Sequence, residues 1–287
     1  MQPLIVEVAI NGTVTKADNQ HVPLTPREMV DCIRACAVAG ASIVHMHAGD
    51  LWPEANGGHA SAPYRETLAA VRESHPDLLV YPTLPASFHL TIQERFAHIE
   101  ALAAEGLLRL VPIDPGTLNW GAFSPDGLGE ELIYKNTMAD VRYVFELCRK
   151  NSLACSMSIF EPGALQLVLA HRAHGSLPAR SIIKFEFSAG RLLFGLNPNR
   201  EGLDAYLSML GDTRIPWMVN LREGDLLEGL GRLAIARGGH VRVGIEDYGG
   251  PRKPRNEELV QEIVALGRSL GRRPATPAEA AHMLGQI

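Results

Sequence analysis

The sequence lacks the features that mark secreted, membrane-spanning and nucleic-acid-binding proteins. Its four cysteines (Cys32, Cys36, Cys148 and Cys155) have neither disulfide nor zinc-knuckle spacing, and no apolar run approaches the roughly 20 residues that cross a bilayer. The first residues show no basic segment followed by an apolar one, so no signal peptide is predicted. The formal charge of −5 and pI near 6.1 give no basic footprint for nucleic acid or anionic membrane. We therefore expect a cytoplasmic protein that binds neither nucleic acid nor membranes.

Nucleotide-binding glycine patterns are also absent. No G-x-G-x-x-G or Walker sequence occurs, and Gly229-Leu230-Gly231 lies inside a predicted helix rather than after a strand. The apolar content of 46% and charged content of 21% are typical of a globular protein with an ample core. Because no linker or low-complexity tract divides the 287 residues, the chain is predicted to be one domain over 1–287.

Short apolar or β-branched runs alternate with amphipathic segments along the whole chain. Strands are predicted at 4–11, 42–47, 78–84, 108–113, 155–160, 182–187, 216–221 and 240–246. Helices are predicted at 26–39, 62–75, 91–105, 137–151, 163–174, 201–210, 224–237 and 256–270. Strict alternation implies parallel strands joined by helical crossovers, and eight such units most simply close into a (β/α)8 TIM barrel. An open doubly wound sheet is the alternative.

Helix boundaries carry local signals. The segments 25–28 (Thr-Pro-Arg-Glu) and 276–279 (Thr-Pro-Ala-Glu) combine an N-cap, a proline at the first helical position and a glutamate at the third, which predicts a capping box at each. The second of these predicts a further short helix near the C-terminus. Helix ends are predicted at Gly40, Gly106, Gly175 and Gly271.

The longest irregular stretches follow predicted strands. They span 50–61, 114–137 and 188–200, after the second, fourth and sixth strands. In a barrel, the loops that follow strands build the active-site face, and long loops are more often functional than accidental. A catalytic face at the carboxyl ends of the strands is therefore expected.

Two histidines, His45 and His47, end the second predicted strand. Residues two apart on a strand point to the same face, so both imidazoles leave it on one side, close enough to share a metal ion. A histidine pair that merely packs in the core or lies on the surface is the competing interpretation. The rest of the chain must decide between them.

The last predicted strand supplies a third candidate ligand. Alternation places Arg242 and Glu246 on its inner face and the intervening valines and isoleucine against the helices. Glu246 then either completes a His2Glu site with His45 and His47 or pairs with Arg242 inside the barrel. A His2Glu set leaves coordination positions open, which is typical of catalytic zinc (Zn2+), and it also suits Fe2+ or another divalent metal.

Asp247 follows that candidate ligand directly. With Arg242 below it on the strand, its carboxylate would be held ionised and oriented, as a general base requires. The alternative is a solvent-facing aspartate in a loop.

These residues carry a family resemblance that runs nearly from end to end. The matching segments are "PLIVEVAING", "LTPREM", "AGASIVHMHAGD", "GTLNWG", "GGHVRVGIEDY" and "GRRPATPAEA". Together they resemble the bacterial beta-keto acid cleavage enzymes, which are metal-dependent (β/α)8 proteins. The His-x-His and Gly-Gly-His-x-Arg-x-Gly-x-Glu-Asp segments carry most of this resemblance.

The resemblance implies a function and a set of site residues. It implies that His45, His47 and Glu246 bind zinc and that the enzyme condenses a β-keto acid with acetyl-CoA, giving acetoacetate and a new CoA ester. Asp247, paired with Arg242, would remove a proton from the keto acid. The resemblance further implies a homo-oligomer, such as the tetramers common in the family, and four substrate-binding residues, Asn11, Thr83, Asp114 and Asn119.

Several positions depart from the family pattern. The segment 12–16 (Gly-Thr-Val-Thr-Lys) offers no acid where the family carries a glutamate, and 48–50 (Ala-Gly-Asp) has no arginine after the histidines. Pro82-Thr83 replaces a serine-threonine pair, and Pro112 replaces a threonine. We therefore expect a different keto acid, without a cationic amino group.

Two other functions are compatible with the same residues. A zinc hydrolase of a lactone or amide would use a metal-bound water as nucleophile with Asp247 as its base. A non-catalytic, metal-dependent binder of keto acids would be stabilised by ligand without turnover. Arg222 and the run 252–255 (Arg-Lys-Pro-Arg) are candidates for binding the CoA phosphates, although solvated surface charge explains them equally well.

Overall fold

The barrel is built from strands and helices that alternate along the chain. The computed structural model describes residues 2–48, 54–85, 89–124, 127–129 and 132–285. Its barrel strands are β1 (Val6–Ala9), β2 (Ile43–Met46), β3 (Leu79–Pro82), β4 (Leu110–Ile113), β9 (Ala154–Ile159), β10 (Ser181–Ser188), β11 (Trp217–Arg222) and β12 (His240–Val243). Its helices are α1 (Pro26–Ala39), α2 (Ser61–Ser74), α3 (Ile92–Ala104), α4 (Met138–Lys150), α5 (Pro162–Ala173), α6 (Arg200–Leu210), α7 (Leu230–Ala236), α8 (Asn256–Ser269) and α9 (Pro277–Leu284).

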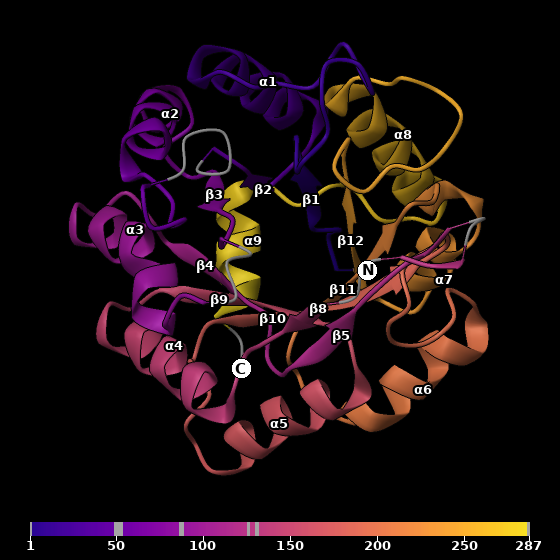
Figure 1. Cartoon of the computed structure of the whole chain (residues 1–287). Coiled ribbons are helices and arrows are strands. Elements are labelled where there is room, and N and C mark those ends of the chain that lie inside the picture. The colour runs from indigo at the N-terminus through magenta and orange to yellow at the C-terminus, as the bar shows by residue number, and fades with distance from the viewer. Residues whose placement is uncertain (1, 49–53, 86–88, 125–126, 130–131, 286–287) are drawn as a thin grey trace.

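The eight barrel strands run parallel in the order β3-β2-β1-β12-β11-β10-β9-β4. The end strands β3 and β4 contact each other, so the sheet curls into a ring with the helices outside it (Figure 1). This arrangement confirms the predicted (β/α)8 barrel and rules out the open doubly wound sheet.

The predicted helix signals are confirmed. At Thr25 and at Thr276 the side chain accepts a hydrogen bond from the third helical residue, whose glutamate binds back to the cap backbone. Gly40 ends α1 in the left-handed region at φ 117°, where a side chain would be strained. The short C-terminal helix predicted from the second capping box is α9.

One predicted helix is divided in two. The segment 224–237 forms a 3-10 turn at Leu226–Glu228 and then α7, with Gly229 at φ 141° between them. A glycine in that region ends the first turn before regular α-helix begins. The sequence prediction was wrong here because it gave hydrophobic periodicity more weight than Gly229.

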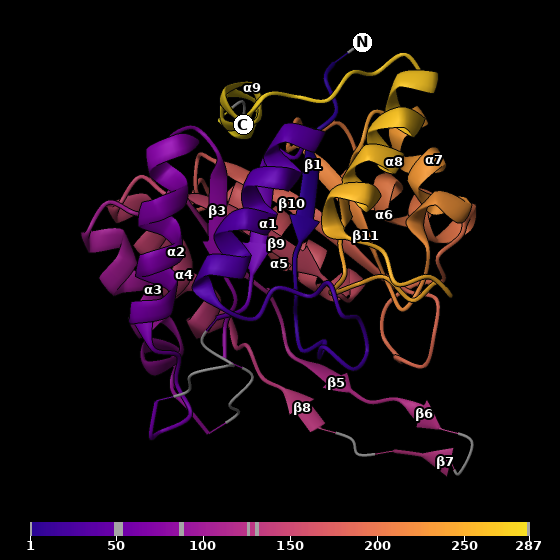
Figure 2. The same ribbon diagram turned by 90° about the horizontal axis from the view of Figure 1, so that it is seen from above.

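The loop after β4 also differs from its prediction as an irregular stretch. It contains two antiparallel ribbons, β5 (Leu118–Trp120) with β8 (Leu132–Tyr134) and β6 (Phe123–Ser124) with β7 (Gly127–Leu128). Figure 2 shows this arm along the face of the barrel opposite α9. The arm therefore lies at the carboxyl ends of the strands, where the predicted site is located.

The barrel is closed at its other end by α9. Inward side chains at the amino ends of the strands form an apolar cluster with Met283 and Leu284 of that helix. The outward side chains Val241 and Val243 join the larger core beneath the helices, as alternation predicted. The closed floor leaves the opposite face of the barrel for a site.

The last strand is shorter than predicted. The sequence analysis extended it to residue 246, but β12 ends at Val243, and Gly244 adopts φ 140°. A Cβ on Gly244 would lie 2.0 Å from the carbonyl oxygen of Ala9 on β1. Glu246 therefore reaches the site from a turn that only glycine permits, rather than from the strand.

Replacing Gly244 with alanine should lower the free energy of unfolding by roughly 3 kcal/mol or more, because backbone strain adds to overlap with Ala9. Gly106→Ala is the matched control, since Gly106 also has positive φ but a Cβ there would meet nothing within 4 Å. It should cost only about 1 kcal/mol. Urea titrations measure both losses, and equal values would contradict the close approach at Gly244.

Candidate functional site

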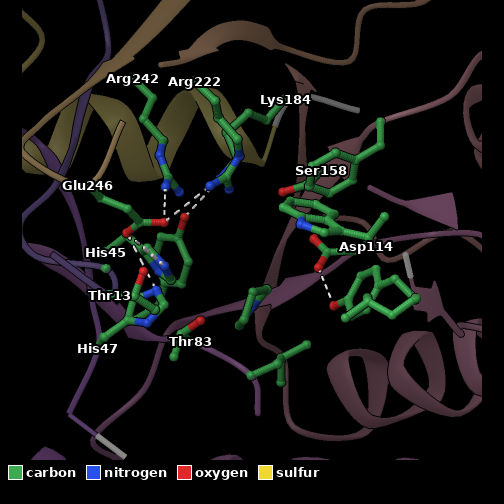
Figure 3. A pocket seen from close by; sticks show the side chains of 18 residues that line it. Thr13, His45, His47, Thr83, Asp114, Ser158, Lys184, Arg222, Arg242 and Glu246 are labelled. Atoms are coloured by element: carbon green, nitrogen blue, oxygen red, sulfur yellow. Dashed lines mark hydrogen bonds and ion pairs between the residues drawn. The ribbon is translucent and has the colours of Figure 1, made fainter. Parts of the chain in front are cut away.

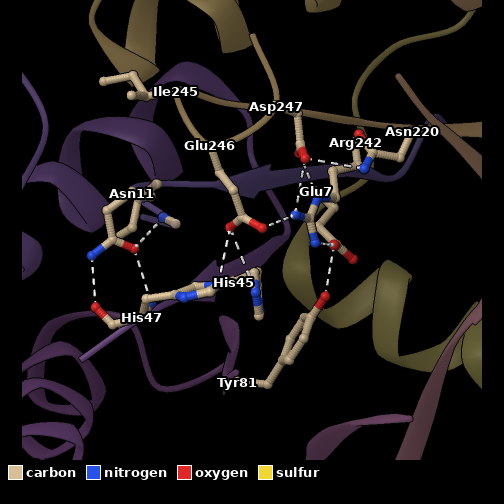
Figure 4. Close-up of polar contacts among 12 residues, drawn as sticks. Glu7, Asn11, His45, His47, Tyr81, Asn220, Arg242, Ile245, Glu246 and Asp247 are labelled. Carbon is tan, nitrogen blue, oxygen red and sulfur yellow. Dashed lines mark hydrogen bonds and ion pairs between the residues drawn. The ribbon is translucent and has the colours of Figure 1, made fainter. Parts of the chain in front are cut away.

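Three potential metal ligands converge at the carboxyl ends of neighbouring strands. His45 lies on β2, His47 follows it, and Glu246 lies on the turn after β12. Glu246 Oε2 is 3.6 Å from His45 Nε2 and 3.4 Å from His47 Nε2. One ligand atom of each residue lies within 4.8 Å of the other two (Figure 4). The structure thus brings together the three residues that the sequence analysis grouped.

The surroundings of this triad fit a cation. Arg242 Nη2 donates to Glu246 Oε1 over 2.7 Å, while Oε2 is buried with no hydrogen-bond partner among the described residues. Burial lowers the pKa of His45 well below its ordinary value, so its imidazole is neutral, as a metal ligand must be. One oxygen of Glu246 therefore pairs with Arg242, and the other faces the histidines, where a metal ion could bind.

Asn11 holds the backbone that carries one ligand. Its Nδ2 donates to the carbonyl oxygen of His47 over 2.6 Å, and its Oδ1 accepts from the backbone N–H of His47 over 2.9 Å. Asn11 is fully buried and does not line the cavity above the triad. Its contacts therefore orient His47 (Figure 4) rather than touching a ligand in the cavity.

Asp247 lies beside the triad and behind Arg242. Its Oδ2 accepts from Arg242 Nε over 2.7 Å, and its Oδ1 accepts from Asn220 Nδ2 over 3.1 Å. The residue is 4% exposed, so it is not the solvent-facing loop aspartate that the sequence left open. Arg242 lines the cavity and Asp247 does not, which places the guanidinium between this carboxylate and the cavity.

A buried charged network that the sequence analysis missed lies beneath the triad. Glu7 Oε1 accepts hydrogen bonds from Lys184 Nζ at 3.0 Å and from the Tyr81 hydroxyl at 2.7 Å. Burial opposes the ionised form of Glu7, yet Lys184 and Arg242 outweigh it and lower its pKa. The available signal was charged residues between apolar neighbours, at Glu7 in β1 and at Lys184 and Glu186 in β10.

A second cluster surrounds Asn220 on β11. Asn220 Nδ2 donates to Glu186 Oε2 over 2.7 Å as well as to Asp247. Arg222 Nε donates to the same Glu186 oxygen over 3.3 Å. Arg222 thus lies inside the barrel mouth, with its guanidinium over the rings of Trp120 and Phe160.

The net charge of this interior leaves room for a cation. Three cationic side chains lie among four buried or nearly buried carboxylates. The cations are Lys184, Arg222 and Arg242, and the carboxylates are Glu7, Glu186, Glu246 and Asp247. With neutral histidines one negative charge remains, and the buried oxygen of Glu246 that faces the histidines is where a divalent ion would compensate it.

The triad opens into a cavity of about 410 Å³. The substrate-binding residues predicted from the resemblance are divided by it: Thr83 and Asp114 line the cavity, whereas Asn119 is exposed on β5, outside it. Gly12 and Thr13 line it where the family glutamate was expected, and a Cβ on Gly12 would lie 2.4 Å from Glu246 Cγ. Of the segment 48–50, only Ala48 belongs to the described residues.

Figure 3 shows the polar groups of the cavity in two sets. Glu246, His45 and His47 lie on one side, and Asp114 and Ser158 lie on the other. The cationic groups of Lys184, Arg222 and Arg242 lie along the edge that connects the two sets (Figure 3).

A (β/α)8 barrel with a candidate divalent-metal centre at the carboxyl ends of its strands defines a class of metal-dependent barrel enzymes. A family model described as beta-keto acid cleavage enzyme matches residues 3–285, so the chain belongs to that family. The resemblance identified from the sequence is confirmed.

Curated relatives match over almost the whole chain. The 3-keto-5-aminohexanoate cleavage enzyme of Fusobacterium nucleatum subsp. nucleatum is 29% identical, covering 99% of this chain and 98% of its own. The 3,5-dioxohexanoate:acetyl-CoA acetone transferase of Paraburkholderia graminis is 26% identical, covering 98% and 95%. The 3-oxoadipate:acetyl-CoA acetyltransferase of Cupriavidus necator is also 26% identical, covering 99% and 95%.

Solved structures share the fold. The ternary complex of ObcA with a C4-CoA adduct and oxalate has a TM-score of 0.67 at 14% identity, covering 92% of this chain and 67% of that chain. The 3-dehydroquinate dehydratase of Geobacillus kaustophilus has a TM-score of 0.54 at 14% identity, covering 95% and 93%. At these identities the likeness concerns the barrel alone.

Glu246→Gln should weaken the binding of added Zn2+, used as a probe of the triad, by about 100-fold or more, because it removes the negative charge of the carboxylate that faces both imidazoles. The affinity is measured by competition with a chromogenic chelator, and metal retained after dialysis is measured by elemental analysis. Glu223→Gln, a carboxylate near the rim that pairs with Arg191, is the control and should leave the affinity unchanged. Equal affinities for wild type and Glu246→Gln would show that the triad does not hold the ion.

Glu7→Gln should lower the free energy of unfolding by roughly 3–5 kcal/mol, because it leaves the ammonium of Lys184 buried without its carboxylate. Adding Lys184→Met should recover much of this loss, since no unpaired ammonium then remains. Urea unfolding of the two single variants and the double variant gives the coupling between them. Strictly additive losses would contradict the contact.

Proposed function

We propose that the protein condenses a β-keto acid with acetyl-CoA to give acetoacetate and a new CoA ester, with zinc as its metal. The observation that carries this proposal is the triad His45–His47–Glu246 at the mouth of a barrel that belongs to the beta-keto acid cleavage enzymes. The acetyl-CoA transferase names of relatives aligned over almost the full chain support the same reaction. Fe2+ or another divalent metal suits the same ligands.

The proposed reaction exchanges one carbon–carbon bond for another. The keto acid loses a proton from carbon 2, and that carbon attacks the thioester carbonyl of acetyl-CoA with loss of the CoA thiolate. The thiolate then attacks the original ketone, and the bond from that carbon to carbon 2 breaks. The new CoA ester leaves, and carbon 2 regains a proton as acetoacetate is released.

The bound metal would act as a Lewis acid that stabilises the enolate of the keto acid. His45, His47 and Glu246 would hold it. Arg242 lines the cavity next to Glu246 and supplies positive charge where negative charge develops. Lys184 lines the cavity too, and its ammonium is fixed by Glu7 and Tyr81.

Asp247 is the proposed base and proton carrier. Asp247 shares Arg242 with Glu246, and the guanidinium holds its carboxylate beside the triad. Because it faces Arg242 and Asn220 in this structure, the proposal requires its carboxylate to move toward the cavity when the keto acid enters.

The phosphates of CoA would bind at the rim of the site. Arg222 lies inside the cavity and over aromatic rings, a position better suited to the acyl end of the reactants than to phosphates. Arg252 pairs with Glu262 on the surface, and Arg255 lies exposed nearby. The CoA phosphates are therefore assigned to the run 252–255 rather than to Arg222.

A homo-oligomer and a cytoplasmic location stay predictions. Ile133 on β8 and Met138 at the start of α4 are 60% and 66% exposed. Such exposed apolar side chains would suit a contact between subunits. Among the described residues, no helix is long and apolar enough to cross a membrane.

Zinc-loaded protein should consume β-keto acids only when acetyl-CoA is present and should release acetoacetate in equal amount. Asp247→Asn should lower kcat about 100-fold or more, with metal content unchanged, because the proton acceptor is lost. Asp212→Asn, an exposed carboxylate, is the control. Turnover without CoA, or hydrolysis of lactones or amides, would favour a hydrolase instead, and ligand binding without any turnover would leave only a binder.

A further inference from the structure

The cavity has a second half that the triad does not use. Besides its polar groups, the cavity is lined by the apolar or aromatic side chains of Leu84, Pro112, Trp120, Leu132, Tyr134 and Phe160. The rings of Trp120 and Phe160 meet edge to face at 5.5 Å. Trp120, Leu132 and Tyr134 come from the arm after β4, so this apolar wall depends on ribbons that fold back over the barrel mouth.

Asp114 places one carboxylate in this apolar half. Its Oδ2 accepts from the hydroxyl of Tyr134 over 2.6 Å, and that hydroxyl accepts from Nη2 of the buried Arg95 over 3.1 Å. Burial, together with the charge of Asp114, raises the pKa of Tyr134, so the phenol keeps its proton and acts as the donor. The carboxylate is thus oriented, while no cation among the described residues pairs with it directly.

This half of the cavity disfavours an anionic group and lacks a free aromatic face for a cationic one. An anionic group would meet the carboxylate of Asp114 at close range in a partly desolvated space. A cationic group would be attracted by Asp114, but it would add a second cation to the wall that Arg222 already occupies. The guanidinium carbon of Arg222 lies 5.9 Å from the centre of the Trp120 ring and 5.8 Å from that of Phe160. The aromatic faces that could hold a cation are therefore already used by Arg222.

We propose that the β-keto acid carries an uncharged, mainly apolar side chain with a hydroxyl group that donates a hydrogen bond to Asp114. The inference rests on the proposed function, because the triad half of the cavity then holds the keto acid head. The side chain lies against the apolar wall, and its hydroxyl uses the carboxylate oxygen that Tyr134 leaves open. Asp114 is half-buried, so its open oxygen would lose solvent contacts when a side chain fills the cavity. Asp114 therefore selects for the hydroxyl as well as against a negative charge.

Four β-keto acids that differ in their side chain test this selectivity. They are 3-oxohexanoate, 5-hydroxy-3-oxohexanoate, 5-amino-3-oxohexanoate and 3-oxoadipate. With zinc-loaded wild type, kcat/KM for the hydroxy acid should exceed that for 3-oxohexanoate roughly ten-fold or more. The kcat/KM values for 5-amino-3-oxohexanoate and for 3-oxoadipate should both be lower than that for 3-oxohexanoate. Ligand-induced rises in melting temperature, measured without acetyl-CoA, should follow the same order.

Two substitutions at Asp114 distinguish the effect of its carboxylate from that of the surrounding side chains. Asp114→Leu should abolish the preference for the hydroxy acid while retaining turnover of 3-oxohexanoate. Asp114→Asn keeps an acceptor for Tyr134, so it still tests the role of the charge if Asp114→Leu does not fold. It should raise kcat/KM for 3-oxoadipate roughly ten-fold relative to 3-oxohexanoate. Asp212→Asn is the control and should leave every ratio unchanged. Ratios between substrates cancel any loss of active protein.

The outcomes distinguish the two proposals. Best turnover of a charged keto acid, or hydroxy-acid ratios that are unchanged in both Asp114 variants, would overturn the inference while leaving the acetyl-CoA reaction intact. Absence of turnover with all four acids would count against the proposed function. The order of melting-temperature shifts would then still decide whether Asp114 selects a hydroxylated side chain.

Discussion

The site depends on one buried guanidinium. Arg242 contacts Glu7 below it, Glu246 above it and Asp247 beside it, at N···O distances between 2.7 and 3.4 Å. Three carboxylates this close to one another would repel strongly in a low-dielectric interior without it. Because Arg242 neutralises part of that charge, Glu246 can keep one oxygen for a metal ion. The barrel, which closes the sheet around β12, holds Arg242 at this central position.

The surrounding polar layer makes the interior of this barrel unlike a purely apolar core. Lys184 and Tyr81 share Glu7, while Asn220 joins Glu186 to Asp247. Such networks are costly when one member is missing and specific when all are present. Glu7 and Glu186 are consequently held in place before any ligand enters, which is the preorganisation that charge-stabilising catalysis requires.

Much of the fold and part of the site could be predicted from the sequence. Alternating strand and helix patterns, with capping boxes such as that at Thr25, define the barrel because they are local. His45 and His47 are predictable from the two-residue repeat of a strand. Glu246 was predicted at the site but wrongly placed on the strand. It reaches the triad from a turn that requires Gly244, because Ala9 of a distant strand lies so close.

The remaining features depend on contacts between distant strands. Nothing local shows that Glu7 meets Lys184, or that Asn11 orients His47 instead of touching substrate. The ribbons of the arm are short and depend on packing against the barrel mouth, so periodicity missed them. Asn119 was chosen by motif, and its outward direction follows from the pairing of β5 with β8, which places Trp120 toward the cavity instead.

The closure of the barrel floor by α9 has a consequence for the order of events. With one end filled by Met283 and Leu284, reactants and products must share the opposite mouth. In the proposed reaction the shorter reactant would occupy the depth of the barrel, and the long CoA carrier would follow it in, with its nucleotide portion left outside. A cavity that opens at one end favours ordered binding in this reaction. The keto acid would enter before the thioester, and the product held deepest in the barrel would leave last.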